Sequence, residues 1–106
     1  MVLTSGFKKE LKHIAKKHRQ ILDDLDILID ELQMNPTKGV DLGQNVYKIR
    51  LAISGTNKGK SGGARVVTYV YFLDEVVFLS EIYLKNEHDT VDHKLIIERL
   101  KDQGLI

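Results

Sequence analysis

The residues best suited to chemistry are six basic side chains in the middle of the chain. Between Thr37 and Leu73 the sequence has a single acidic residue, Asp41, and six cations, which are Lys38, Lys48, Arg50, Lys58, Lys60 and Arg65. The whole chain of 106 residues has a net charge of only +1, so this segment concentrates positive charge. Such a concentration favours a partner that carries phosphate groups.

The alternation of apolar and polar residues predicts three β-strands that would present these cations. A strand over 46–53 would bury one face and leave Lys48 and Arg50 on an open, basic face. A second strand is predicted over 64–73 and a third over 76–85. The short turn between them favours antiparallel pairing.

The same alternation brings further residues to the basic face. Arg65, Tyr83 and Lys85 can join Lys48 and Arg50 there, and Lys58 and Lys60 would lie at its rim in a glycine-rich loop. Cations beside aromatic rings are what a single-stranded RNA site requires. For any one of these side chains, a solvated strand face is the simpler interpretation.

The first third of the chain predicts helices. Its apolar residues recur at helical spacing from Phe7, Thr4 or Ser5 can cap the start, and Asn35–Pro36 stops the pattern. A single helix would be about 40 Å long, which exceeds the width of a domain of this size. Because the first half is basic and the second acidic, we expect two antiparallel helices that break at 17–20.

A last helix is predicted near the C-terminus. Asp89 or Thr90 would cap it, and Gly104 would end it. The predicted fold class is therefore α+β: one domain over 1–106, with an N-terminal helix hairpin packed on a small antiparallel sheet and a C-terminal helix.

The segment SGTNKGKS at 54–61 nearly matches the phosphate-binding loop G-x-x-x-x-G-K-[ST]. That motif must open a helix, whereas the residues from Ala64 onward are typical of a strand. A nucleotide triphosphatase is therefore disfavoured, and a flexible hairpin loop explains the glycines but not the two lysines.

Composition narrows the remaining possibilities. The chain has no cysteine, which fits a reducing cytosol, and the histidine pairs are five residues apart, a spacing that does not suit zinc ligands on a helix. We therefore expect surface histidines and no metal. No apolar run approaches the roughly 18 residues of a membrane span, and no secretory signal is seen at the N-terminus.

The order of the predicted elements, with YKIR at 47–50, GKSGGARVVTYVYF at 59–72 and IYLKNE at 82–87, resembles the RelE/ParE superfamily of toxins from type II toxin–antitoxin pairs. The GKSGGAR block with the later IYxKxE is most similar to the HigB/RelE-like subgroup. The resemblance covers nearly the whole chain.

This resemblance implies a cytoplasmic, ribosome-dependent endoribonuclease that cuts mRNA without metal or cofactor, and a cognate antitoxin as partner. By matched position, Arg65 would stabilise the scissile phosphate, and Lys60 and Lys85 would hold phosphate or assist proton transfer. Tyr83 and His88 are candidates for base stacking or for the general acid, and Lys48 and Arg50 lie in the strand that would line the active groove. Lys58, at the rim of the basic face, is a further candidate for binding phosphate. Two other interpretations remain: a gyrase-inhibiting toxin that cuts nothing, and a degenerate RNA-binding module.

Overall fold

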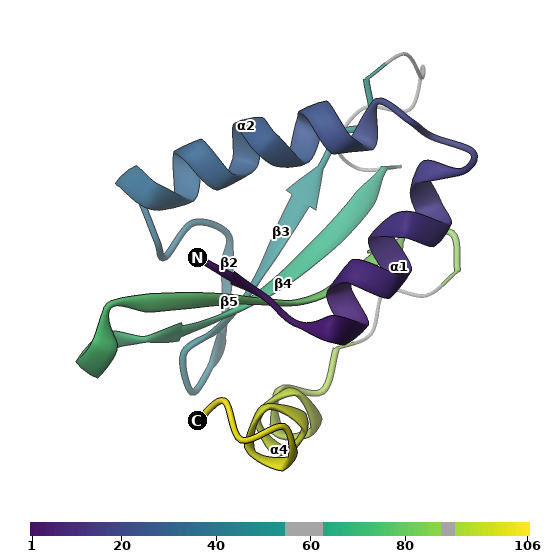
Figure 1. Cartoon of the computed structure of the whole chain (residues 1–106). Helices are drawn as coiled ribbons and strands as arrows, with labels where there is room; N and C mark the ends of the chain where they lie inside the picture. Colours follow the sequence, from purple (N-terminus) through teal and green to yellow (C-terminus); the bar gives the residue numbers. More distant parts are fainter. Residues whose placement is uncertain (55–62, 88–90) are drawn as a thin grey trace.

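The computed structural model describes residues 1–54, 63–87 and 91–106. Its elements in chain order are β1 (Val2–Leu3), α1 (Ser5–Ala15), α2 (Ile21–Met34), β2 (Val40–Gly43), β3 (Val46–Leu51), β4 (Ala64–Tyr71), the short 3₁₀ helix η1 (Phe72–Asp74), β5 (Val76–Leu84) and α4 (His93–Asp102) (Figure 1). The predicted α+β class is confirmed, because the described residues form three α-helices and a five-stranded sheet.

The sheet is mixed rather than purely antiparallel. Its strand order is β1-β5-β4-β3-β2, and β1 runs parallel to β5 while every other neighbouring pair is antiparallel. The three predicted strands form its centre, but the two edge strands were not predicted. A two-residue strand is too short to show alternation, and the four residues of β2 end in a glycine.

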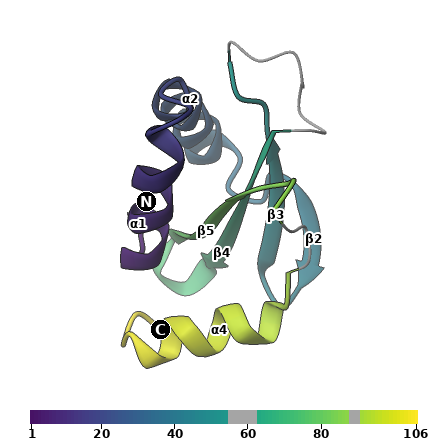
Figure 2. The ribbon, with the colours of Figure 1, turned by 90° about the vertical axis from the view of Figure 1, so that its right-hand side faces the viewer.

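The helices cover both faces of the sheet (Figure 2). Side chains of α1 and α2 form one core with Ile49, Val66 and Leu79, whereas α4 forms a second core with Val46 and Val67. Because Val66 and Val67 are consecutive in β4, they point to opposite faces, so α4 packs on the face opposite the helix pair.

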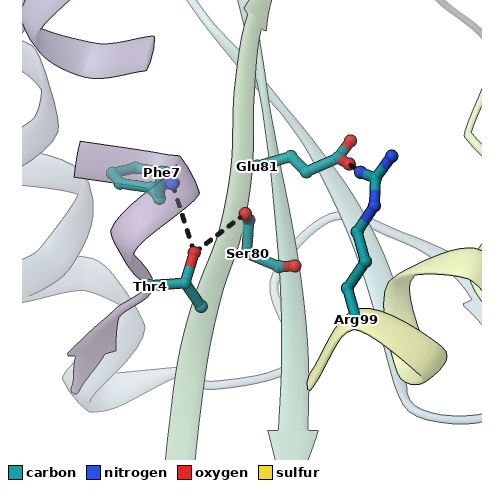
Figure 3. Close-up of polar contacts among 5 residues, drawn as sticks. All are labelled: Thr4, Phe7, Ser80, Glu81 and Arg99. Carbon is teal, nitrogen blue, oxygen red and sulfur yellow. Dashed lines mark hydrogen bonds and ion pairs between the residues drawn. The ribbon is translucent and has the colours of Figure 1, made fainter. Parts of the chain in front are cut away.

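The N-terminus of α1 is tied directly to the sheet. The Oγ1 atom of Thr4, the N-cap residue, accepts a hydrogen bond from the amide of Phe7 at 3.2 Å and donates one to the carbonyl of Ser80 at 3.1 Å (Figure 3). One buried hydroxyl therefore caps the helix and joins it to β5.

The predicted break between the first two helices is confirmed, since α1 ends at Ala15 and α2 begins at Ile21. The ion pairs seen among the described residues join Lys38 to Glu31 and Arg99 to Glu81, so neither of these two pairs links α1 to α2.

The last helix begins later than expected. Asp92 is its N-cap and its side chain accepts from the amide of Lys94 at 2.9 Å, so the prediction of a cap at Asp89 or Thr90 is wrong. Those two residues lie outside the described ranges. The predicted stop is confirmed: Gly104 has φ +72°, and the amides of Gly104 and Leu105 donate to Lys101 and Leu100, which is a Schellman motif.

Candidate nucleic-acid interface

Three of the predicted site residues form one row across the centre of the sheet. Arg50 of β3 is paired with Arg65 of β4, which is paired in turn with Tyr83 of β5. Neighbouring strands lie about 4.8 Å apart, and directly paired residues point to the same face. The register therefore places these side chains side by side on the face that α4 packs against.

Exposure changes sharply along this row. The side chain of Arg50 is exposed, whereas only 2% of Arg65 and 4% of Tyr83 is accessible to solvent. Tyr83 belongs to the core that contains Ile96 and Leu100 of α4, so this helix covers the β5 end of the row. The expectation of an open face is therefore correct at Arg50 and wrong at Arg65 and Tyr83.

The buried guanidinium of Arg65 is held close to its own backbone. Its Nη1 atom donates to the carbonyl of Ala64 at 3.1 Å, at the start of β4. A charge in this position is screened little by solvent, because the local dielectric is lower than that of water. Arg65 is therefore a buried member of the row and not a surface contact.

The two remaining described cations flank the row. Lys48 is half-buried and lies two residues before Arg50, on the same face of β3. Lys85 is exposed directly after β5, and its amide donates to the carbonyl of Gly63 at 3.0 Å. Among the described residues of the predicted site, the exposed positive charge is thus carried by Arg50, at the β3 end of the row, and by Lys85, two residues beyond Tyr83.

Among the described residues of this face, the acid nearest to the row is engaged in an ion pair. Glu81 lies in the next row, opposite Val67, and its carboxylate pairs with Arg99 of α4 (Figure 3). That ion pair neutralises Glu81, so it opposes the cations of the row weakly.

Three predicted site residues cannot be placed: Lys58, Lys60 and His88 lie outside the described residues. The described neighbours of those segments are Ser54, Gly63 and Glu87. All three lie at one end of the sheet, because β3 ends there, β4 begins there and β5 ends there.

Asp24 was missed by the sequence analysis, in which it counted only as part of an acidic helix face. Its carboxylate, 8% exposed, accepts hydrogen bonds from the amide of Ser54 at 2.8 Å and from the Ser54 hydroxyl. It thereby anchors the chain just after β3 to the first turn of α2. Its position on the buried side of the helix, beside Leu25 and Leu28, was the signal available in the sequence.

Within residues 1–54, 63–87 and 91–106, no cluster of three or more histidine, cysteine or acidic side chains could hold a metal ion. No helix in the same ranges is long and apolar enough to cross a membrane. The arrangement of the described cations suits contact with an anionic backbone such as that of RNA.

Comparison with known proteins gives no assignment. Neither a scan against protein-family models nor a search of curated proteins finds a significant match to this chain.

Proposed function

We propose that this protein is the toxin of a type II toxin–antitoxin pair and cleaves translated mRNA on the ribosome without a metal ion. The observation that carries the proposal is the row Arg50–Arg65–Tyr83, which places two cations and an aromatic ring on one sheet face. The family resemblance of the sequence around these residues supplies the reaction.

The reaction that fits these groups is an internal transesterification. The 2′-hydroxyl of one nucleotide attacks its own 3′-phosphate, the bond to the 5′-oxygen breaks, and a 2′,3′-cyclic phosphate and a 5′-hydroxyl remain. Such a step needs a proton acceptor for the 2′-hydroxyl, positive charge near the phosphorane and a proton donor for the leaving oxygen.

The described residues divide these tasks by their exposure. Arg50 and Lys85 can contact phosphates directly, and Arg65 stabilises charge from its buried position between them. A lysine accepts a proton only when neighbouring cations lower its pKa. The roles of Lys60 and His88 in proton transfer rest on the sequence resemblance alone, and that of Lys58 in phosphate binding rests on its place in the basic, glycine-rich loop of the sequence.

A non-catalytic RNA-binding protein is the second candidate. The burial of Arg65 and Tyr83 favours it, because neither side chain can touch a bound phosphate in this conformation. The exposed cations would then bind RNA without cutting it. A gyrase-inhibiting toxin is the third alternative, and toxicity that depends on gyrase rather than on translation would identify it.

These functions are separated by induced expression followed by primer extension on a translated mRNA. We expect growth arrest with cuts that require translation, and strong loss of cutting in Arg50→Ala and Lys85→Ala. Lys8→Ala removes an exposed cation of α1, on the opposite side of the sheet, and should cut like the unchanged protein. Arrest without cuts would refute the nuclease, and cutting that both site variants retain would refute the assigned site.

A further inference from the structure

Among the described residues, the second half of β5 has no neighbouring strand on the side of β1. β1 pairs with β5 only at Val2–Phe78 and Leu3–Leu79, and Thr4 then turns the chain into α1. The amide of Thr4 donates a hydrogen bond to the carbonyl of Leu79, and the hydroxyl of Thr4 donates one to the carbonyl of Ser80. β5 continues to Leu84, but no strand in the described part of the chain accompanies this second half.

The unpaired edge presents backbone groups of Ile82. The amide of Lys85 donates to the carbonyl of Gly63, and backbone hydrogen bonds to a neighbouring antiparallel strand come from every second residue. The backbone N–H and C=O groups of Tyr83 therefore point toward β4, and those of Ile82 point away from it. Among residues 1–54, 63–87 and 91–106, no group bonds to the outward amide or carbonyl of Ile82.

The outward amide and carbonyl of Ile82 belong to a buried residue. Ile82 as a whole residue is only 1% exposed, and it is also one of the residues that line a groove. Buried backbone donors and acceptors are nearly always paired in native proteins. An unpaired donor and acceptor on one strand edge are a template for another extended chain.

A groove lies along this same edge. It has a volume of about 490 Å³ and is bounded by α1, β5 and α4, with Ile82 and Tyr83 from the strand and Val91, Leu95 and Ile96 from the other wall. Figure 3 draws four of its lining residues: Thr4 bonds to the Ser80 backbone on one side of β5, and Glu81 pairs with Arg99 of α4 on the other. The groove thus offers apolar contact beside the unpaired backbone groups.

The rim of the groove is acidic. Glu81 and Arg99 neutralise each other, so the other charged side chains among the described lining residues are Glu10, Glu87 and Asp92 against Lys9. All four of these side chains are exposed. A partner with positive charge therefore complements the rim.

We propose that this groove binds an extended segment of another protein chain, which adds as a strand to the edge of β5 at Ile82. Its apolar side chains would enter the groove and its basic side chains would meet the acidic rim. An extended partner is favoured over a helix because a helix has already used its own backbone groups. The proposal does not depend on nuclease activity.

A second copy of this chain is a poorer occupant. The other edge of the sheet is β2, whose residues Val40–Gly43 carry one acidic side chain, Asp41, and no cation. Pairing β2 of one copy with β5 of another would bring Asp41 toward an acidic rim. Charge therefore disfavours edge-to-edge pairing between copies.

The probe is a fluorescent peptide of about eight residues that alternates lysine and valine, with a glutamate–valine peptide as its counterpart. Binding to the full chain is measured by anisotropy. We expect the basic peptide to bind at least about tenfold more tightly than the acidic one. Equal binding of both peptides, or binding of neither, would overturn the proposal.

Gly6 provides a variant that blocks the groove without disturbing the fold. It lines the groove within α1, and a Cβ atom there would meet nothing within 4 Å. Gly6→Trp should weaken binding of the basic peptide about tenfold or more and also favour the helix. Ser5→Trp adds the same ring one residue away, outside the lining, and should bind like the unchanged protein.

Charge and backbone pairing are tested separately. Glu10→Lys combined with Glu87→Lys should weaken binding of the basic peptide, while Glu98→Lys, on α4 outside the lining, should not. Amide hydrogen exchange by NMR should show slower exchange at Ile82 on binding. Binding that leaves Ile82 unchanged, or a dimer that Gly6→Trp disrupts in the absence of peptide, would contradict the proposed occupant.

Discussion

Arg50 on β3 lies directly opposite Arg65 on β4, so two cations of very different exposure share one cross-strand pair. Like charges in this position destabilise a sheet, and the nearest acid of the face is bound to Arg99. This pair lies at the centre of the proposed RNA site.

The first prediction follows from this pair. Arg50→Gln should raise the free energy of unfolding by about 0.5 kcal/mol, because it removes repulsion with Arg65. The gain should shrink at high salt, since salt screens the exposed charge. Urea unfolding at low and high ionic strength measures both effects. Arg19→Gln removes an exposed cation outside the sheet and should change stability little. A loss of stability in Arg50→Gln would contradict the expected repulsion.

The second prediction concerns the link between α1 and β5. Thr4→Ala removes the N-cap of α1 and leaves the buried carbonyl of Ser80 without its side-chain donor. We expect a loss of about 2 kcal/mol in the free energy of unfolding. Thr37→Ala, at an exposed position, should lie within roughly 0.5 kcal/mol of the unchanged protein. Equal unfolding midpoints for the two variants in urea would rule out the proposed role of Thr4.

The third prediction concerns Asp24. Asp24→Ala should destabilise the protein by about 2 kcal/mol, because the amide and hydroxyl of Ser54 lose a charged acceptor. Asp26→Ala, two residues along the same helix but exposed, should have an effect within about 0.5 kcal/mol. Thermal unfolding of the two variants side by side tests whether burial separates them. A similar small effect in both would show that the Ser54 contact contributes little.

The fourth prediction concerns a close backbone approach at Gly39. A Cβ atom at this position would lie 2.6 Å from the Lys48 carbonyl oxygen, and the residue has φ +107°. Gly39→Ala should cost about 3 kcal/mol from strain and overlap together. Gly43→Ala shares a positive φ, +92°, but meets nothing within 4 Å, so about 1 kcal/mol is expected. Chemical denaturation measures the free energy of unfolding of both variants. Equal losses in the two variants would contradict the importance of the close approach at Gly39.

Much of the fold followed from local patterns in the sequence. The helical spacing and the charge reversal located the break between α1 and α2, and the alternation around Ile49 and Arg50 located β3. These features depend on neighbouring residues, so a single sequence contains them. The edge strands β1 and β2 depend instead on pairing with distant residues such as Phe78 and Lys48, which local patterns do not reveal.

The candidate site was predicted less completely. Alternation correctly put Arg65 and Tyr83 on the face of Arg50, because parity along a strand is a local property. Their burial could not be predicted, since it depends on where α4 packs after the chain turns back at the end of β5. The tie between Asp24 and Ser54 likewise joins residues 30 positions apart.

The most direct test of the central claim is analysis of RNA ends after incubation of the purified protein with mRNA on ribosomes. We expect cleavage that requires the ribosome and leaves a 2′,3′-cyclic phosphate with a 5′-hydroxyl, with strong loss of cleavage in Lys85→Ala. Products with a 3′-hydroxyl and a 5′-phosphate, or no cleavage at all, would contradict the proposed reaction.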